Sequence, residues 1–441
     1  MTTRRGLIST GAIGVATFGL SSKARSGCSG SATGGAVQYL GTVSSRDALS
    51  KVDGSRHSVM YLAETGREGI FEWKDADLST EVPFDPQQGL YVAGANQQTG
   101  SAGAWKRGFE GPVRAEWFGV VGDGLTDSTA ALEAAIAWMR SSGGGILALP
   151  AGTIVVRDLG NLACANLTIQ GQGMQHTILK AQHSGVAFLV DAFPDNNPDQ
   201  NFIDQFNLED ITLEGNDRTS DILMLQGVSR SHFIRVDLRE AGVASSKALH
   251  LRCAVTCLFM ECYVSVNYKP MAHRPRWGIY ADHGGRGGVS TGHTSNCTFV
   301  NCEMNGALIG VELARADQTS MIGGACQNCV SYGMIIRPPS RYNSFTNVAF
   351  ENLRSRADVV DQGVVTSFEG CYFSEKIEFA GEQCRVRNCF GERFEVKADA
   401  EYTDIANIRF NHWNTGEGGF FDASRSTRVR SLYDVDAEKY L

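Results

Sequence analysis

The chain has 441 residues, of which 48 are acidic and 40 are basic, so its formal charge is -8. That balance argues against a general nucleic-acid-binding protein, which is usually basic. Hydrophobic residues make up 42% of the chain, which suffices for a sizeable core and excludes wholesale disorder. The 50 glycines far outnumber the 10 prolines and follow no Gly-X-Y period, which excludes a collagen and favours many tight corners between short strands.

Residues 1–30 have the pattern of an export signal, which we set apart from the fold. Thr3-Arg4-Arg5-Gly6-Leu7-Ile8 resembles a twin-arginine signal, and a short apolar stretch from Gly11 to Leu20 follows it. A membrane-spanning helix needs about 20 apolar residues, so neither this stretch nor a later one predicts a membrane span. We therefore expect a twin-arginine-type signal peptide and a periplasmic or secreted protein.

Residues 36–112 predict a small β-rich unit. Strand-like runs such as Ser58-Val59-Met60-Tyr61-Leu62 and Gly69-Ile70-Phe71-Glu72-Trp73 alternate there with turns rich in Gly, Asp and Pro. An amphipathic helix is predicted next, over 130–140, with Asp127 as its N-cap. We expect this helix to cap the strands that follow and to hide an open sheet edge.

Short β runs then recur to about residue 400. Equivalent runs begin at Cys302, Ala325, Ala349, Cys371 and Cys389, at spacings of 23, 24, 22 and 18 residues. Units this short cannot bury an apolar face alone, so they must stack coil on coil. We predict an all-β chain with a right-handed parallel β-helix over 115–400 and a C-terminal cap or tail over 401–441. A β-propeller would need blades of about 40–45 residues.

The spacing of the 12 cysteines favours free thiols over disulfides. Three pairs lie five residues apart in similar local sequence: Cys257 and Cys262, Cys297 and Cys302, Cys384 and Cys389. Cysteines at matching places of a repeat are typical of small hydrophobic side chains in a core. No two Cys-x-x-Cys motifs stand at zinc spacing, so no metal site is predicted from them.

One polar segment leaves a calcium site open. Asp195-Asn196-Asn197-Pro198-Asp199-Gln200 carries side-chain oxygens of the kind that bind Ca²⁺. An ordinary polar corner explains the same residues and is the preferred interpretation. No other cofactor is predicted. The glycines are expected to supply the left-handed backbone of the corners between strands.

The segment from Trp117 to Val156 resembles the opening of the pectate-lyase-like family that includes rhamnogalacturonase- and epimerase-type right-handed β-helices. The matching segments are Phe118-Gly119, Gly122-Asp123-Gly124, Thr126-Asp127, Ala130-Ala131-Leu132, Ala134-Ala135-Ile136, Gly144-Gly145 and Leu149-Pro150-Ala151-Gly152. The resemblance implies the fold and a polysaccharide partner, and it leaves the reaction open, since the family covers lyases, hydrolases, epimerases and phage tailspike depolymerases. The Asn-Thr-Asp, Asp-Asp, Gly-His-Gly and Arg-x-Lys segments of its polygalacturonase-type hydrolases are absent. Trimers are common among its tailspike members, so a homotrimer stays open.

One strand of each repeat predicts a ladder of outward side chains. Alternation along a strand places neighbours on opposite faces, and equivalent residues of adjacent coils lie about 4.8 Å apart. If Leu249, Ile279, Val311 and Met334 point inward, the outward residues are His250, Tyr280, Glu312 and Ile335. The residues two positions further along are Arg252, Asp282, Ala314 and Arg337.

The longest interruption of the repeat lies beside this ladder, between Val264 and Cys297. Insertions in solenoids form loops on one face, often the binding face. This one is basic within an acidic chain, which predicts an anionic partner such as an acidic, uronate-bearing polysaccharide. We expect the substrate to be bound by Lys269, His273, Arg274, Arg276, Trp277, Arg252 and His250.

Three functions follow from these residues. β-Elimination from a uronate needs a cation for the carboxylate, for which Arg274, Arg276 or Arg337 is suited. It also needs an acid and a base, which are expected among Tyr280, His283, His273 and Lys269. A glycoside hydrolase would instead use two carboxylates, Asp282 and Glu312. These two could equally pair with Arg252 and Arg315 across coils, which would suit a non-catalytic carbohydrate-binding or structural β-helix. We favour the polysaccharide lyase.

Overall fold

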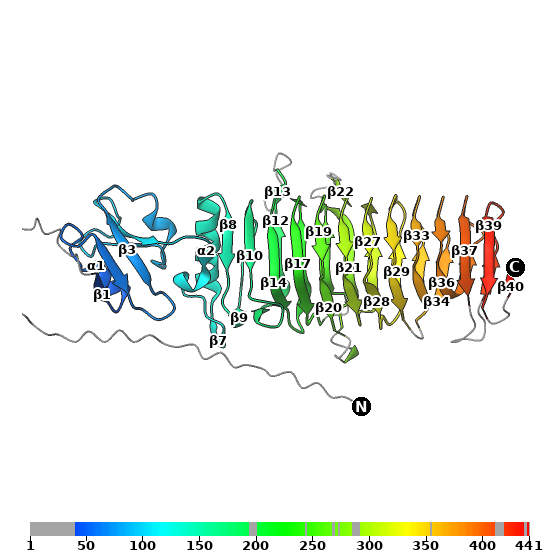
Figure 1. The fold of residues 1–441 in the computed structure, drawn as a ribbon, viewed down its shortest axis with the longest axis horizontal. Coiled ribbons are helices and arrows are strands. Elements are labelled where there is room, and N and C mark those ends of the chain that lie inside the picture. Colours follow the sequence, from blue (N-terminus) through cyan, green and yellow to red (C-terminus); the bar gives the residue numbers. More distant parts are fainter. Residues whose placement is uncertain are drawn as a thin grey trace, which may run out of the picture. The chain divides into compact units, whose positions relative to one another are not determined.

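The computed structural model describes residues 40–193, 201–242, 245–266, 270–271, 274–284, 292–352, 355–410, 419–435 and 439–440. The predicted signal peptide lies outside the described residues. Strands dominate these ranges, and most of them belong to one sheet of 33 strands (Figure 1). No described helix is long and apolar enough to cross a membrane.

The first described segment forms a sheet of five strands in the order β1-β2-β3-β5-β4. Its strands are β1 (Gly41–Val43), β2 (Val59–Leu62), β3 (Gly69–Lys74), β4 (Tyr91–Ala93) and β5 (Ala104–Gly108), accompanied by helix α1 (Arg46–Ser50) and the short helix η1 (Val82–Phe84). Trp105, Phe71, Leu62 and Leu49 are buried together beneath it. This β-rich structure falls within the segment predicted over 36–112, and those boundaries stay a prediction.

Helix α2 (Thr129–Ser141) begins one residue earlier than predicted and follows η2 (Ala115–Phe118). Its N-cap is Ser128, so the prediction of Asp127 as the N-cap was wrong by one residue, although the Asp127 carboxylate accepts from the Thr129 amide at 3.0 Å. Leu132, Ile136 and Met139 of its apolar face join the main core. That the helix caps the strand stack stays a prediction.

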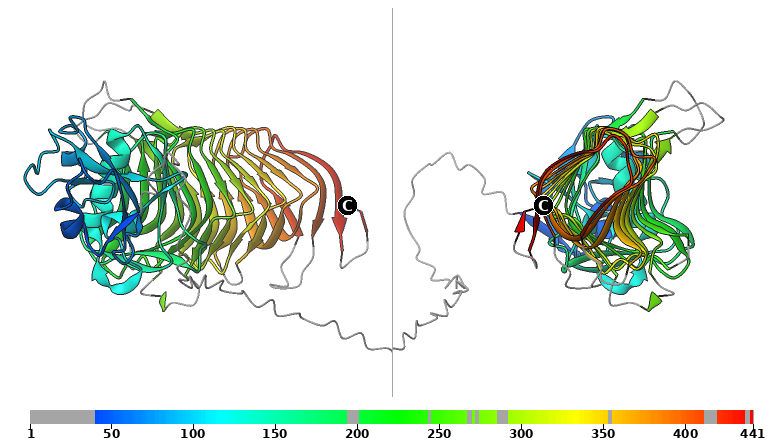
Figure 2. Two further views of the ribbon diagram at one scale, coloured as in Figure 1. Left: turned by 60° about the vertical axis from the view of Figure 1, so that its left-hand side comes forward. Right: turned by 90° about the vertical axis from the view of Figure 1, so that its right-hand side faces the viewer.

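The strands after α2 form a parallel β-helix, which confirms the predicted fold class. The coils start with β6 (Val113–Arg114), β7 (Asp123–Asp127), β8 (Gly145–Ala148) and β9 (Gly152–Val156). Register pairs then connect each coil to the next. Equivalent strands of successive coils thereby form three parallel stacks along the β-helix, which we call the first, second and third run. Figure 2 shows the strands of successive coils lying over one another.

The first run consists of β10 (Leu167–Gln170), the first halves of β14 (Asn207–Glu214) and β17 (His232–Arg239), then β19 (Leu258–Met260), β23 (Thr298–Val300), β27 (Ser320–Ile322), β30 (Ser344–Thr346), β33 (Ser367–Glu369), β35 (Arg385–Arg387), β37 (Asp404–Phe410) and β39 (Arg428–Asp434). The second run consists of β11 (Thr177–Ala181), the second halves of β14 and β17, then β20 (Tyr263–Ser265), β24 (Glu303–Asn305), β28 (Ala325–Gln327) and β31 (Ala349–Glu351).

The third run consists of β12 (Gly185–Asp191), β15 (Thr219–Gln226), β18 (Lys247–Arg252), β21 (Trp277–Gly284), β25 (Ile309–Leu313), β29 (Tyr332–Ile336), β32 (Ala357–Asp361), β34 (Tyr372–Phe379), β36 (Phe390–Val396) and β38 (Gly419–Asp422). Short strands accompany the runs: β13 (Ile203–Asp204), β16 (Val228–Ser229), β22 (Gly292–Ser295), β26 (Ala316–Asp317) and β40 (Lys439–Tyr440).

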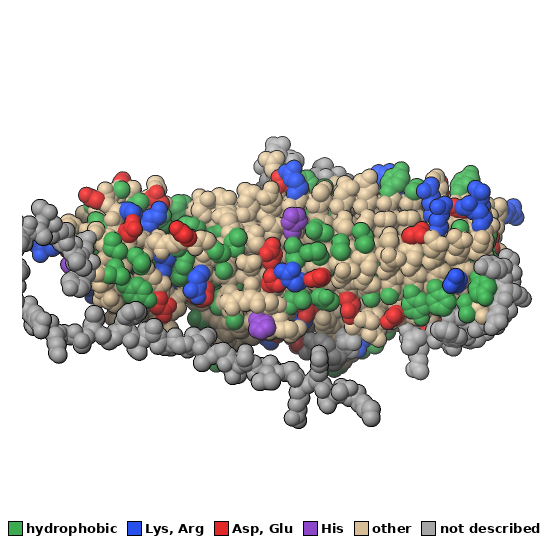
Figure 3. Space-filling model, viewed as in Figure 1, with side chains coloured by type: hydrophobic (Ala, Val, Ile, Leu, Met, Phe, Trp, Pro, Cys, Tyr) green, Lys and Arg blue, Asp and Glu red, His purple; other side chains and the backbone are tan. Residues whose placement is uncertain are grey.

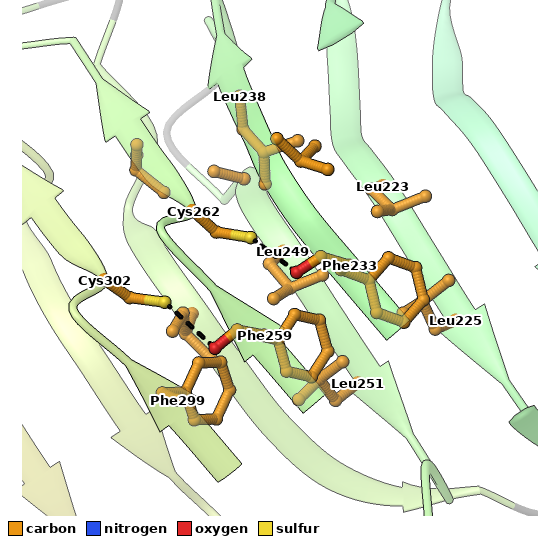
Figure 4. Close-up of a cluster of buried hydrophobic side chains, with 14 of the residues drawn as sticks. Leu223, Leu225, Phe233, Leu238, Leu249, Leu251, Phe259, Cys262, Phe299 and Cys302 are labelled. Atoms are coloured by element: carbon orange, nitrogen blue, oxygen red, sulfur yellow. Dashed lines mark hydrogen bonds between the residues drawn. The ribbon is translucent and has the colours of Figure 1, made fainter. Parts of the chain in front are cut away.

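Stacked side chains fill the interior of the coils. Phe259 stacks between Phe233 and Phe299, with ring centroids 4.7 and 4.6 Å apart (Figure 4). Every described cysteine is free and buried, as the repeat predicts. The Cys262 and Cys302 thiols each lie beside a backbone carbonyl of the preceding coil, 3.2 and 3.4 Å from the oxygens of Phe233 and Phe259.

The corners between strands are not made mainly by glycine, so that prediction was wrong for most coils. Two columns of residues have left-handed backbone, and nearly all are non-glycine: one runs from Arg230 to Tyr402, and the other includes Asn301, Asn347 and Asn388. Asparagine suits this conformation because its short polar side chain tolerates it. Some glycines serve close coil contacts instead: a Cβ on Gly310 would lie 2.5 Å from the backbone oxygen of Gly333.

Candidate functional site

The predicted ladder lies on the third run. Register pairs place His250 of β18 beside Tyr280 of β21, Tyr280 beside Glu312 of β25, and Glu312 beside Ile335 of β29. The neighbouring residues Leu249, Ile279, Val311 and Met334 are buried in the main core, as the alternation predicts. His250 and Glu312 are only 6% and 7% exposed. The ladder is therefore a partly covered polar layer, and not an open row of side chains.

His250 lies between two carboxylates from neighbouring coils. Its Nδ1 is 3.4 Å from Oδ1 of Asp221 on β15, and its Nε2 is 3.4 Å from Oδ1 of Asp282 on β21. A cation accompanies each carboxylate: Lys247 Nζ is 3.3 Å from Asp221 Oδ1, and Arg252 Nε is 3.7 Å from Asp282 Oδ1. These five residues come from three consecutive coils and form one charged cluster.

Several atoms of this cluster are buried without a hydrogen bond to a described residue. They are both ring nitrogens of His250, Oδ1 of Asp221, Oδ1 of Asp282 and Nε of Arg252. Buried polar atoms normally have partners, and leaving one unsatisfied costs about 1–3 kcal/mol. Catalytic hydrogen bonds are often long before substrate binds and shorten in the complex. An accumulation of such atoms is typical of a binding or catalytic site.

Asp221 is ionised more readily than an ordinary aspartate. Burial favours its neutral form, but the neighbouring His250 and Lys247 side chains outweigh burial and lower its pKa. A carboxylate held in the charged form beside an imidazole fixes the orientation of the ring.

Aromatic rings cover one side of the charged cluster. The Tyr280 ring lies 5.6 Å from the His250 ring in an edge-on arrangement, and 4.9 Å from the Trp277 ring. Lys247 Nζ is 5.3 Å from the centroid of Trp277 and 5.5 Å from that of Tyr280, and the Arg276 guanidinium is 4.6 Å from Trp277. Aromatic and cationic groups on one surface are suited to a sugar ring that carries an anion.

Tyr280 keeps its phenolic proton more strongly than a free tyrosine. Burial raises its pKa most, the Asp282 and Glu312 carboxylates raise it further, and Arg337 and Arg276 oppose this only in part. At neutral pH its hydroxyl is therefore protonated.

Glu312 is engaged on both of its oxygens. Trp277 Nε1 donates to Oε2 at 2.7 Å, and Arg337 Nε donates to Oε1 at 2.9 Å. The interpretation in which Asp282 pairs with Arg252 agrees with the structure, whereas the partner of Glu312 is Arg337 and not Arg315. Arg337 side-chain exposure is 45%, so part of the guanidinium also faces solvent.

A cavity of about 360 Å³ continues the site toward later coils of the third run. Its lining includes three cations, Arg337, Arg356 and Lys376, and one acid, Glu378. Lys376 Nζ lies 2.5 Å from Glu378 Oε1. The cationic surface thus extends past Arg337.

Other predicted site residues lie apart from this cluster or outside the description. His283 pairs in register with His293 where β21 meets β22, and its place in the strand directs it away from the side shared by Tyr280 and Asp282. Arg274 Nη1 donates to the Gly306 oxygen at 3.4 Å. Lys269, His273 and the segment from Asp195 to Gln200 lie outside the described residues.

The interruption between Val264 and Cys297 contains two regular strands, β21 and β22, so it is not one long loop.

Asp221 and Lys247 were missed from the sequence. Both were accessible to the same argument, because one earlier coil added to the ladder pairs Asp221 with Lys247 and Met224 with His250. Within the described ranges, no group of three or more His, Cys, Asp or Glu side chains could hold a metal ion.

The comparisons with known proteins agree with the fold. The family model described as rhamnogalacturonase A/epimerase, pectate lyase-like, matches residues 113–372. Mannuronan C5-epimerase AlgE1 of Azotobacter vinelandii is 33% identical over 111 residues, which span 22% of this chain and 7% of the epimerase. The chain therefore covers a small part of that relative.

Two solved structures share the β-helix at low identity. The tailspike protein gp49 of the Acinetobacter baumannii bacteriophage Fri1, a capsular polysaccharide depolymerase, superposes with a TM-score of 0.57 at 17% identity, covering 88% of this chain and 69% of the tailspike. Pantoea stewartii WceF, a glycan biofilm modifying enzyme with a tailspike-like parallel β-helix, gives a TM-score of 0.51 at 16% identity, covering 90% of this chain and 52% of WceF.

Proposed function

Because the chain belongs to the rhamnogalacturonase A/epimerase, pectate lyase-like family, we propose that it is a polysaccharide lyase acting on an acidic polysaccharide. The reaction begins with removal of the C5 proton of a uronate residue. The observation that carries the proposal is the buried, unsatisfied cluster of His250 between Asp221 and Asp282, with Tyr280 against the imidazole. It combines a candidate base, a proton donor and cations on one surface.

The cations have the first role. Removing a proton next to a carboxylate places further negative charge on that carboxylate, and guanidinium groups stabilise such charge through paired hydrogen bonds. Arg276 and Arg337 both act on the pKa of Tyr280, which supports their position close to the reacting group. Trp277, stacked with Arg276, offers a ring for the sugar.

His250 and Tyr280 then divide the proton transfers. His250 takes the C5 proton while Asp221 orients its ring. The electron pair of the C5–H bond becomes the C4–C5 double bond, the C4–O bond breaks, and Tyr280 gives its proton to the leaving oxygen. The raised pKa of Tyr280 supports this donor role.

A glycoside hydrolase is less well supported. Such an enzyme needs one carboxylic acid that donates a proton and one carboxylate that attacks or activates water. Both Glu312 oxygens accept hydrogen bonds, from Trp277 and Arg337. Asp282 lies beside Arg252 and His250. Asp282 also pairs in register with Arg252, and Glu312 with Tyr280, so the two carboxylates are not direct neighbours on adjacent coils.

C5-epimerisation is the second candidate, and the 33% match to a mannuronan C5-epimerase favours it. It shares the first step with elimination. The two reactions diverge afterwards, because an epimerase returns a proton to the opposite face of C5 and leaves the C4–O bond intact. The same cluster would serve both.

The test is to incubate the full chain with polymers of uronic acids in D₂O and to follow three products. Unsaturated uronate ends, detected by ultraviolet absorbance, support the lyase. Deuterium at C5 of an uncleaved polymer supports the epimerase. Saturated reducing ends without either signal refute C5 chemistry and support the hydrolase. The His250→Asn variant should lose both the absorbance and the deuterium signal.

Two accompanying proposals concern location and assembly. The twin-arginine-like N-terminus supports export to the periplasm or beyond, where acidic polysaccharides are accessible. Cell fractionation with and without the Arg4→Lys, Arg5→Lys change tests it. A homotrimer is tested by the sedimentation of the purified chain.

A further inference from the structure

The outward residues of the first run include four arginines in the C-terminal coils. Register pairs place Arg385 of β35 beside Asp404 of β37, and Asp404 beside Arg428 of β39. Two residues along the same strands, Arg387 and Arg430 flank Ala406. Figure 3 shows Lys and Arg side chains gathered over these coils. We call Arg385, Arg387, Arg428 and Arg430 the arginine patch.

Three arginines on earlier coils each have a carboxylate of their own. Arg230 pairs with Asp204, Arg235 with Asp210, and Arg341 with Asp317.

The arginine patch departs from this pattern, because Asp404 is the one described carboxylate that pairs with any of its four arginines. Arg387 and Arg430 both bind that carboxylate at 2.9 Å, and the hydrogen bond from Arg387 is the largest cause of its lowered pKa. Arg385 and Arg428 make no ion pair with any described residue. Within the described part of the chain, two guanidinium groups are thus left without a paired carboxylate, although the net charge of the chain is -8.

A cavity of about 510 Å³ lies between these two arginines. Its lining is Gln383, Arg385, Tyr402, Thr403, Asp404, Ser426 and Arg428. Asp404, the one acid among them, is already bound by the two arginines outside the cavity. A ligand with two or more negative charges would therefore meet two guanidinium groups that no described carboxylate pairs, on backbone positions about 10 Å apart because they lie two coils from each other.

Tyr402 adds an aromatic surface to the cavity. It is 65% exposed, and its φ of 55° lies in the left-handed region, which is unusual for a bulky side chain. Most residues at this corner of other coils are not aromatic, for example Thr256, Asn296 and Gln383. The ring stands where a sugar could stack beside the two arginines.

We propose that this cavity is a second, non-catalytic binding site for an acidic polysaccharide. Arg385 and Arg428 pair with carboxylates of the polymer, and Tyr402 stacks on a sugar ring. The cavity lies on the first run, whereas the candidate active site lies on the third, so the two sites contact different parts of one polymer. Binding at two sites raises the retention of a long chain without new contacts at the active site. The identity of the polymer rests on the proposed function.

The test compares polymer binding by the full chain and two matched double variants. Arg385→Gln with Arg428→Gln removes the two unpaired charges of the patch. Arg56→Gln with Arg157→Gln removes two exposed arginines elsewhere and serves as the control. The patch variant should bind a uronate polymer at least about tenfold more weakly than wild type. The control variant should bind as wild type does.

Further arms separate this site from the active site. Tyr402→Ala should weaken polymer binding, and turnover of short uronate oligosaccharides should be unchanged in all patch variants. Arg385→Lys with Arg428→Lys retains the two positive charges, so polymer binding should be lost only in part. This variant keeps the test interpretable if the glutamine variant misfolds. Equal binding by patch and control variants overturns the proposal. Weaker polymer binding by the patch variant with no turnover of any uronate polymer upholds the site and overturns the proposed function.

Discussion

Tyr280 is the residue whose chemistry the proposed mechanism needs most. Burial and two carboxylates raise the pKa of its hydroxyl, and its ring lies against the imidazole that we propose accepts the substrate proton. Tyr280→Phe keeps the ring and removes the proton, so we expect a loss of about 10²–10⁴ in kcat with little change in KM. Steady-state kinetics on a uronate polymer measures both constants.

A matched control for that change exists on another run. Tyr263 of β20 also has a pKa raised by burial, but it lies on the second run. Tyr263→Phe should leave kcat unchanged. Equal losses in the two variants would show that the effect of Tyr280→Phe is structural and not chemical.

The buried carboxyl group of Asp358 should make the free energy of unfolding depend on pH, independently of catalysis. It is fully buried, and burial raises its pKa from 3.8 to about 7 despite hydrogen bonds from Asn352 and the Glu375 amide. Between pH 3.8 and about pH 7, the folded state therefore holds a proton that the unfolded chain has already released. Stability is full below the unfolded pKa and falls as pH rises to about 7.

Asp358→Asn removes this titration. The unfolding free energy of wild type relative to the variant should fall between pH 4 and pH 7 by up to about 4 kcal/mol, and it should change little above that range. Chemical denaturation of both proteins at several pH values measures the difference. A difference independent of pH would contradict the assignment to Asp358.

At the scale of the element, the left-handed backbone at the corners determines which substitutions a coil tolerates. Asn347 has a φ of 53°, and its side chain lies over Gly370 of the next coil, whose added Cβ would be 2.3 Å from the Asn347 oxygen. Alanine is disfavoured in this backbone by about 1–2 kcal/mol, whereas glycine adopts it freely. Asn347→Ala should therefore lower the denaturation midpoint more than Asn347→Gly. The opposite order would contradict a role for the left-handed backbone.

The corners also show where sequence reasoning stopped. Short repeats and alternation predicted the strands and their inward residues, because a strand's side chains follow a period of two. The corner conformation carries no such period: Thr256, Gln318 and Val365 all adopt left-handed backbone at equivalent places. Stacking against neighbouring coils selects that conformation, and composition alone favoured glycine.

Burial of the cysteines within the coils predicts their reactivity. Every described cysteine is free, and burial raises the pKa of thiols such as Cys253, to about 11, and Cys329, to about 12. Thiolate is the reactive form, so the native protein should resist alkylation. Denatured protein should react at all described cysteines without a reductant. Mass spectrometry counts the labels, and labels that appear only after reduction would contradict free thiols.

At the scale of the whole molecule, the fold was predictable and the site only in part. The ladder of His250, Tyr280 and Glu312 follows from alternation and repeat length, and the register agrees with it. The pairings of Glu312 with Arg337 and of His250 with Asp221 depend on how long side chains reach between coils. Sequence spacing does not determine that reach, which is why Arg315 was expected in place of Arg337.

The position of basic residues was likewise predicted only in part. The interruption between Val264 and Cys297 indicated a cationic region, and Arg276 does lie over Trp277 beside the candidate site. The arginine patch at the other end of the coils was not anticipated. Its arginines are spaced as ordinary strand residues, and only the register shows that they surround a single carboxylate.

The central claim is that the reaction starts by removing the C5 proton of a uronate. The most direct measurement compares the turnover of a uronate polymer carrying deuterium at C5 with that of the unlabelled polymer under single-turnover conditions. A normal primary isotope effect, absent from bond cleavage that does not involve C5–H, is the predicted result. Product formation at equal rates from both polymers, with saturated ends, would contradict the claim and identify a hydrolase.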